Sequence, residues 1–347
     1  MHPISAADSV SLAVQRTKEF LFRPFTWGTY LKLGLVAILT EGIGSSFHSG
    51  SHSTSSPGTG LGSGLPFNFT PEVIAAIIAA VVVAIVLGIV ILYFITRLRF
   101  AFFHCLVHNT KQIRPGWEFY REQAGRFFWM NLGVGFCFLL IVALIAIPFV
   151  GGFWRLIHDT APGGQPDIMQ VLALVLPLIP IVILLGLAGL AIDVVLRDWM
   201  LPHYALDDAS AGEAWQEVWA NVTAEKRQFL VYALLRLILP MIAGMAVFVV
   251  LLIPGLVMAG AAGAAIYTVH SSFADATGAA MVAGIAIQGF FAVVAFGFAL
   301  LASVCLGGPV STAVREYAII FYAGHYPALG EILEQTPPPA FGVITNP

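Results

Sequence analysis

Charged residues are scarce in this sequence. Of its 347 residues only 10% are Asp, Glu, Lys or Arg, whereas 59% are hydrophobic, and the mean hydropathy is +0.88. A soluble domain carries about 25% charged residues. A chain with so few cannot cover a globular surface with polar groups, so part of its surface must face lipid. The composition excludes an ordinary soluble domain and indicates an integral membrane protein.

Recognisable chemical motifs are also missing. The three cysteines lie in or beside apolar runs and form no CxxC pattern, so we expect neither a disulfide nor a zinc–cysteine site. The net charge is −3 and no basic block points to nucleic acid. There is no Walker loop, dinucleotide-binding glycine fingerprint or nucleophile elbow. We therefore expect no cofactor and no standard soluble-type enzyme, although a lipid enzyme with scattered polar residues stays open.

Long apolar runs are what the sequence has instead. A membrane-spanning helix needs about 20 apolar residues. Five uncharged runs are long enough, at 73–95, 127–154, 168–192, 237–269 and 276–314. A sixth run, 26–44, contains Lys32 and Glu41, which we expect to snorkel to the interface at opposite ends. The sequence predicts an all-α, polytopic integral membrane protein with six transmembrane helices.

Lys and Arg alternate between the loops. Loops 45–71 and 267–278 contain none, and 155–167 contains only Arg155, whereas the connectors 97–126 and 197–236 and the N-terminal segment are rich in them. The positive-inside rule then places both termini and both connectors in the cytoplasm. We expect a multi-pass protein of the cell membrane, the inner membrane of a bacterium, with a flexible Ser/Gly-rich outer loop at 45–71 and a Pro-containing cytoplasmic tail at 327–347.

Amphipathic segments precede three of the spans. In the third, Ser210 and Glu213 form a capping box, and an apolar stripe follows on one face while Glu217 lies on another. The predicted stripes are Val10, Val14, Thr17 and Leu21 in 5–25; Trp117, Tyr120, Ala124 and Phe127 in 116–132; and Trp215, Val218, Trp219 and Val222 in 208–229. We predict three cytoplasmic helices at the membrane interface, anchored by Trp117, Trp199, Trp215 and Trp219.

This unit of surface helix, span, outer loop and span recurs three times within one membrane domain covering 1–347. With His104 set against His203, Trp117 and Trp215 fall within one residue of register. A repeat of this size organises the chain. The predicted pseudo-repeats are about 5–109, 110–208 and 209–326.

Polar residues gather at the inner end of the fourth span. Asp193 and Arg197 are one helical turn apart, which predicts an ion pair. The predicted functional cluster is Asp193, Arg197, Asp198, His203 and Asp207. Separately, His104 and His108 have the i, i+4 spacing that can place two imidazoles on one metal ion, although histidines at a membrane interface are common.

The passage 196–235, LRDWMLPHYALDDASAGEAWQEVWANVTAEKRQFLVYALL, resembles a known cytoplasmic signature. It is similar to that of uncharacterised polytopic membrane proteins related to the membrane domain found beside some glycerophosphodiester phosphodiesterases. The matching positions are the exit turn Asp198, Pro202, Leu206 and Asp207 and the helix start Glu213, Ala214 and Trp215. The resemblance implies a span, a turn, a surface helix and a re-entering span. It implies no reaction, because the phosphodiesterase barrel is absent.

Three functions are compatible with these observations. The leading hypothesis is a non-enzymatic membrane component that scaffolds or assembles with other membrane proteins or with copies of itself in the lipid bilayer. The second is a transporter or lipid-handling permease, suggested by the repeats, the prolines within the spans and the Asp193/Arg197 pair. The third is an intramembrane lipid enzyme, in which His104, His108, His203 and Asp207 converge.

Overall fold

The structure is a computed structural model that describes residues 5–46, 71–159, 168–273 and 279–335. Within these ranges the regular structure is helical, with no strand, as the sequence predicts. Five helices are long and apolar enough to cross a membrane, at 75–107, 121–154, 168–206, 226–272 and 282–323. They coincide with the five uncharged runs, as expected for a multi-pass membrane protein. Residues 47–70 of the predicted loop 45–71 lie outside the described residues.

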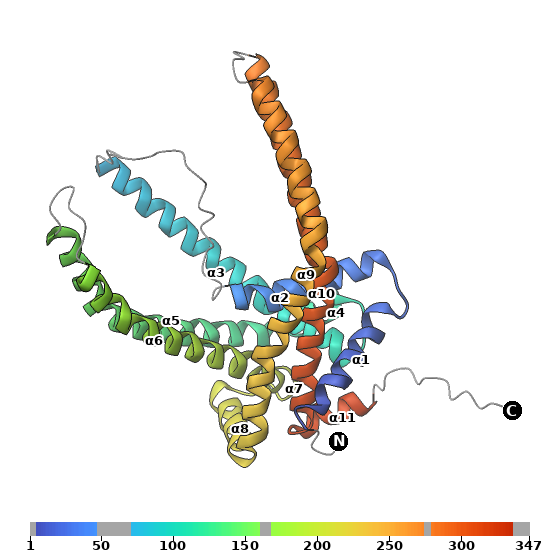
Figure 1. Ribbon diagram of the computed structural model, residues 1–347. Coiled ribbons are helices and arrows are strands. Elements are labelled where there is room, and N and C mark those ends of the chain that lie inside the picture. Colours follow the sequence, from blue (N-terminus) through green and yellow to red (C-terminus); the bar gives the residue numbers. More distant parts are fainter. Residues whose placement is uncertain (1–4, 47–70, 160–167, 274–278, 336–347) are drawn as a thin grey trace. The chain divides into compact units, whose positions relative to one another are not determined.

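The chain divides by its contacts into two compact units that interleave in sequence. Unit 1 comprises 1–43, 104–112 and 221–347, and unit 2 comprises 44–103 and 113–220. The boundary runs through one continuous helix, α3 (Pro71–Val107), whose last residues belong to unit 1. Figure 1 labels the helices of both units.

Unit 1 is built around two long neighbouring helices, α9 (Lys226–Ser272) and α10 (Ala279–Ala323) (Figure 1). α9 continues through Pro240 and Pro254 and contains 47 residues. At about 1.5 Å per residue this helix is about 70 Å long, more than twice the ~30 Å of bilayer hydrocarbon. This hairpin therefore extends beyond the hydrocarbon region at one or both ends.

The first and last helices of unit 1 pack against α10. α1 (Asp8–Phe22) does so through small residues, and its buried face includes Ser9, Ala13, Thr17 and Phe20. The predicted face was wrong at Val14, which is 55% exposed. Small side chains such as Ser9 and Ala13 let α1 approach α10 closely, so the face that carries them is the buried one. At the other end of the chain, α11 (Pro327–Gln335) buries Leu329 and Leu333, so the predicted tail begins as a packed helix.

α2 (Trp27–Ser46) lies across α10 (Figure 1). The Tyr30 hydroxyl donates a 2.5 Å hydrogen bond to the Cys305 carbonyl oxygen, and a Cβ added at Gly308 would lie 2.7 Å from the Gly34 Cα. Two turns further along α2, Ile38 still contacts Gly307. Residues 30–38 of α2 therefore meet only about one turn of α10, which requires a steep crossing angle.

Glu41 does not snorkel to an outer interface as predicted. Its carboxylate accepts a 2.8 Å hydrogen bond from Arg236 of α9, and both side chains are 6% exposed. The prediction failed because Glu41 and Arg236 are 195 positions apart, so only the packing of α2 across the hairpin brings them together. The pair lies near the charged start of α9.

Unit 2 contains a second hairpin, formed by α5 (Arg121–Asp159) and α6 (Ile168–Val194). α3 packs beside the start of α5 through aromatic pairs, with ring centroids 5.4 Å apart for Tyr93 and Phe128 and 5.5 Å apart for Phe100 and Phe127. After α6 come a π-helical turn, η1 (Val195–Met200), and two short helices, α7 (Leu201–Leu206) and α8 (Ala211–Ala224).

The predicted surface helix 116–132 is not a separate element. The chain forms a short helix, α4 (Ile113–Phe119), breaks at Tyr120, and continues directly into α5. Tyr120, Ala124 and Phe127 of the predicted stripe are indeed buried, but most of this stripe belongs to the long span helix. An i, i+4 apolar pattern does not distinguish a surface helix from the first turns of a longer one.

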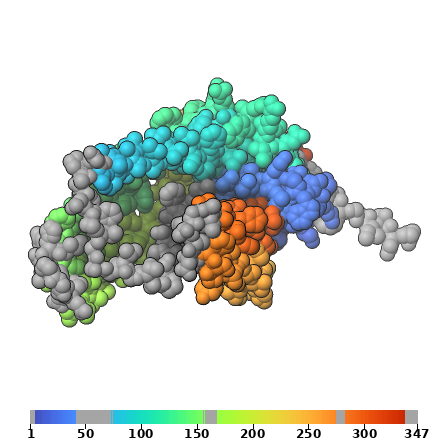
Figure 2. Space-filling model, turned by 90° about the horizontal axis from the view of Figure 1, so that it is seen from above, coloured from blue at the N-terminus to red at the C-terminus, as the bar shows by residue number. Residues whose placement is uncertain are grey.

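Burial is concentrated at the charged ends of the helices. None of the residues in the most apolar 18-residue stretch of any of the five long helices is buried. The space-filling view shows α9 and α10 at the surface in orange (Figure 2), and their exposed large apolar side chains include Phe248, Ile253 and Phe290. The described core instead lies in residues 95–107, 120–128, 196–205 and 314–323 and in the helices that cover them.

Candidate functional site

The candidate site begins where α6 changes into the π-helical turn η1. Leu201 donates its backbone N–H to the Leu196 carbonyl oxygen, five residues back instead of four. Pro202 follows, and a proline in an α-helix clashes with the carbonyl four residues earlier, here that of Asp198. The wider π turn relieves this clash, and such turns are frequent at functional sites.

Arg197 and Asp198 are carried by this π turn and are both buried, at 6% and 2% exposure. Arg197 lies 3.4 Å from the Asp193 carboxylate, as the i, i+4 spacing predicts, and 3.8 Å from that of Asp198. A buried guanidinium between two carboxylates is compensated electrically, so this part of the predicted cluster is an internal ion-pair group.

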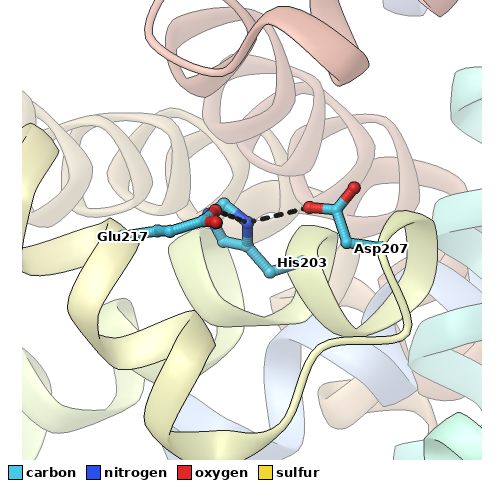
Figure 3. Close-up of side chains that lie close together, drawn as sticks. All are labelled: His203, Asp207 and Glu217. Atoms are coloured by element: carbon cyan, nitrogen blue, oxygen red, sulfur yellow. Dashed lines mark hydrogen bonds and ion pairs between the residues drawn. The ribbon is translucent and has the colours of Figure 1, made fainter.

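His203 of α7 is fully buried and lies between two carboxylates (Figure 3). Its Nδ1 is 2.9 Å from Glu217 Oε2 and 3.4 Å from Asp207 Oδ2. Asp207 follows α7 by one residue, whereas Glu217 comes from α8. The five predicted residues thus form two adjacent groups on one helical segment, one around Arg197 and one around His203.

Glu217 was not predicted as a site residue from the sequence. It lies on a predicted polar face, and its side chain is 57% exposed, so spacing alone gave no reason to single it out. The signal that could have identified it is the short connection between α7 and α8. Four residues, 207–210, must reverse the chain, which brings the second turn of α8 back beside His203.

The turn between α7 and α8 is held at both ends. Asp208 adopts a positive φ of 54°, and Arg126 of α5 donates hydrogen bonds to its carbonyl oxygen and its carboxylate. The predicted capping box is confirmed: Glu213 Oε2 accepts from the Ser210 N–H at 2.8 Å, and Ser210 Oγ accepts from the Glu213 N–H at 3.4 Å. Hydrogen bonding from Ser210 to the ionised carboxylate lowers the pKa of Glu213.

α8 is attached through a narrow face. Ala214 and Val218 are buried, whereas Trp215 and Trp219 are 48% and 57% exposed, with stacked rings whose centroids are 6.0 Å apart. Exposed tryptophans suit the headgroup level of a membrane.

The other two predicted anchors are engaged within unit 2. Trp199 is buried at 6% exposure, and Trp117 stacks under the Arg97 guanidinium, whose carbon lies 4.2 Å from the ring centroid. These two tryptophans pack against the protein itself.

His104 and His108 also lie together, with ring centroids 4.5 Å apart. In the described part of the chain no third histidine, cysteine or carboxylate joins them closely enough to complete a metal site. They belong to unit 1, whereas His203 and Asp207 belong to unit 2.

A second buried acid was also missed. Glu316 of α10 is fully buried and lies 3.5 Å from Arg16 of α1, which also donates a 3.1 Å hydrogen bond to the Leu106 carbonyl oxygen. The sequence feature that could have identified Glu316 is the triplet Arg315-Glu316-Tyr317. Like Arg197-Asp198-Trp199, it consists of an arginine, an acidic residue and an aromatic residue.

The long apolar helices define the class of a multi-pass helical membrane protein. Within that class the chain belongs to the family of unknown function DUF7544, whose model matches residues 4–332. The match does not connect the chain with glycerophosphodiester phosphodiesterases, so that part of the resemblance has no support from it. No curated protein and no solved structure matches the chain.

Proposed function

We propose that this protein is a non-enzymatic integral membrane component that assembles with other membrane proteins or with copies of itself. The observation that carries this proposal is the contrast between packed charged ends and apolar stretches that the chain itself leaves unburied. Within a bilayer, such surfaces are covered by lipid or by helices of other chains. Within each unit the packed charged ends then hold the apolar helices together.

The small residues of α9 favour helices over lipid as the covering partner. A Cβ added at Gly255, Gly260 or Gly263 would meet no atom within 4 Å. Small residues at membrane-helix interfaces let backbones approach closely, and this is a major source of attraction between helices in lipid. These three glycines are therefore free of contacts in their own chain and suit a neighbouring helix.

The proposed topology places the protein in the cell membrane of a bacterium, with both termini and the charged helix ends in the cytoplasm. It follows from the distribution of Lys and Arg. Five crossings come from the long apolar helices, and α2 is the sixth. One observation argues against the sixth crossing. Glu41, near the end of α2, pairs with Arg236 near the charged start of α9, which the topology places on the cytoplasmic side. An accessibility label at Ser53 tests it, because a cytoplasmic result removes the sixth crossing.

The three pseudo-repeats are part of the proposal, and the backbone supports the first two. His104 and His203 each accept a hydrogen bond at their carbonyl oxygen from the N–H four residues later, at 3.0 and 3.1 Å. Five residues after each histidine comes a residue with positive φ, Asn109 at 51° and Asp208 at 54°.

The third pseudo-repeat is supported by side chains. Arg315, Glu316 and Tyr317 of α10 are buried, as are Arg197, Asp198 and Trp199. In both segments a Tyr-Ala pair follows the arginine at the same distance, at 204–205 and at 322–323.

Two alternatives would require different arrangements. A transporter needs a polar cavity at mid-membrane depth, whereas the buried charged residues described here lie near the charged helix ends and pair with one another. A lipid enzyme needs the four polar candidates in one site, whereas the group of possible metal ligands found among the described residues contains His203 and Asp207 but neither His104 nor His108.

Purification in a gentle detergent from native membranes tests the proposal. We expect a complex larger than one chain, and we expect Gly260→Leu with Gly263→Leu to release it while leaving the helical content unchanged. Gly244→Leu is the matched control, because Gly244 lies about 160° around α9 from Gly260 and about 100° from Gly263, and also meets nothing within 4 Å. A monodisperse single chain, unaffected by the double change, would contradict the proposal.

A further inference from the structure

We propose that His203, Asp207 and Glu217 bind one divalent transition-metal ion, which joins α8 to the end of the α6–α7 segment. This site does not depend on the function proposed above. It differs from the histidine pair singled out in the sequence, because it takes one imidazole and two carboxylates instead of two imidazoles.

The ligand atoms have the spacing of a coordination shell. His203 Nδ1 lies 2.9 Å from Glu217 Oε2 and 3.4 Å from Asp207 Oδ2, and all three atoms lie within 4.8 Å of one another. Around an ion with bonds of about 2.1 Å, neighbouring ligand atoms stand about 3.0 Å apart in octahedral and about 3.4 Å in tetrahedral geometry. A small shift of the two carboxylates would therefore complete the shell.

The donor set selects the class of ion. Imidazole suits Zn²⁺, Fe²⁺, Ni²⁺ and Cu²⁺, whereas carboxylates also suit the harder Mn²⁺. Ca²⁺ and Mg²⁺ prefer shells made of oxygen alone. One nitrogen with two charged oxygens therefore favours Zn²⁺, Mn²⁺ or Fe²⁺, and the two negative charges neutralise a divalent ion.

The site has a rigid side and an open side. His203 is fully buried, so packing fixes its ring, whereas the side chains of Asp207 and Glu217 are 41% and 57% exposed (Figure 3). An ion can enter from the exposed side and keep water in its remaining positions. Glu217 is presented by a helix that begins at the Ser210–Glu213 capping box and is seated through Ala214 and Val218.

Metal binding would orient the exposed tryptophans. Glu217 lies between Trp215 and Trp219 on α8. An ion that joins Glu217 to His203 and Asp207 reduces the freedom of α8 to detach and holds the stacked rings in one direction. Without an ion, the two carboxylates can form ion pairs with His203 when its imidazole carries a proton. The experiment must distinguish these two states.

The test uses the full chain in detergent, stripped of metal with EDTA and dialysed. Calorimetric titration with Zn²⁺ should show one saturable site per chain, and Mn²⁺ followed by electron paramagnetic resonance provides a second probe. We expect Glu217→Gln to weaken Zn²⁺ affinity at least tenfold, with a similar loss in Asp207→Asn. Both side chains are partly exposed, so these variants should fold. His203→Gln should abolish binding, but its buried position makes it the less decisive variant.

Two controls match the chemistry of the test. Glu118→Gln changes an exposed carboxylate of the same unit that pairs with Arg114, and it should leave Zn²⁺ affinity unchanged. His104→Gln with His108→Gln removes the other histidine pair and should also have no effect. At the same Zn²⁺ concentration, Zn²⁺ should raise the Tm of the native chain and of both controls more than that of Glu217→Gln.

Either of two results would overturn the proposal. Equal Zn²⁺ affinity in the native chain and Glu217→Gln would place any binding elsewhere. A Tm that falls in Glu217→Gln but does not respond to Zn²⁺ in the native chain would show that the three groups form ion pairs only.

Discussion

The two ends of the α9–α10 hairpin are packed in opposite ways. At the charged end, α2 crosses α10 so closely that a Cβ on Gly308 would lie 2.7 Å from the Gly34 backbone, and Glu41 and Arg236 are buried together. In the apolar part of α9, Met245 and Ile253 are each 70% exposed, and Gly260 and Gly263 meet nothing. The same pair of helices is thus a protein interior at one end and an uncovered surface further along.

This difference shows where the chain supplies its own stability. Removing one partner of a buried ion pair is costly, because it leaves an uncompensated charge. Adding a side chain at a close glycine contact is also costly, because the added atoms have no space. In the apolar part α9 and α10 contact each other, but their outward-facing residues have no such constraint within the chain and are restrained by the bilayer or by partners. Mutations at the two ends should therefore separate folding from assembly.

The largest effect on folding is expected from Arg236→Met. Removing the arginine leaves the Glu41 carboxylate buried without its 2.8 Å partner, which costs about 3–5 kcal/mol of unfolding free energy. Denaturant unfolding in detergent micelles measures the loss. The double variant Glu41→Leu with Arg236→Met should recover most of it, because two apolar groups need no partner. If the Arg236→Met chain were as stable as the native one, the charged end would not depend on its buried ion pair for stability.

A smaller loss is expected from Gly308→Leu. Its side chain has no space beside the Gly34 backbone, and overpacking of this kind costs about 1–3 kcal/mol. Gly260→Leu on the open face of the neighbouring helix is the control and should leave thermal unfolding of the single chain unchanged. If both changes had the same effect, the two ends would not differ in packing.

A still smaller, local effect is expected from Ser210→Ala. Loss of an N-cap serine costs about 1 kcal/mol, and here it should destabilise α8 alone, because the Ser210 Oγ bonds only within the first turn of that helix. Hydrogen exchange of the amides in 211–224 measures this directly. Faster exchange throughout the chain would show that α8 is a part of the packed core rather than an attached surface helix.

The smallest effect is the pH dependence of the same cap. The pKa of Glu213 is lowered in the folded chain, so its carboxylate stabilises α8 above the ordinary glutamate pKa of about 4.3 and this contribution is lost as pH falls below it. The protection factors of the first-turn amides of α8, which correct for the intrinsic pH dependence of exchange, should therefore fall below about pH 4.3 in the native chain. Glu213→Gln should show no such fall in protection, and the same profile in both chains would contradict the role of the Glu213 carboxylate in the cap.

Local spacing predicted much of the candidate site. The Asp193–Arg197 pair and the Ser210–Glu213 capping box both join residues three or four positions apart on one helix, so the helical period alone brings them together. Glu217 could not be predicted in the same way, because its contact with His203 depends on how α8 turns back after residues 207–210. The exposed face of α1 was also misjudged, since close packing favoured Ser9 and Ala13 over the larger Val14.

The sequence by itself determined that this protein lies in a lipid bilayer and that its fold is helical. Uncharged runs of more than 20 residues have one stable form in lipid, because a helix satisfies every backbone polar group within its own segment. Only the tertiary structure decided which charges are buried together. Arg236 pairs with Glu41, and Arg16 pairs with Glu316, although the two residues of each pair are far apart in the sequence. Periodicity and spacing describe only residues that are close in the sequence, so they cannot predict these contacts. These contacts arise because each buried charge needs a partner, and the helix crossings determine which partner is within reach.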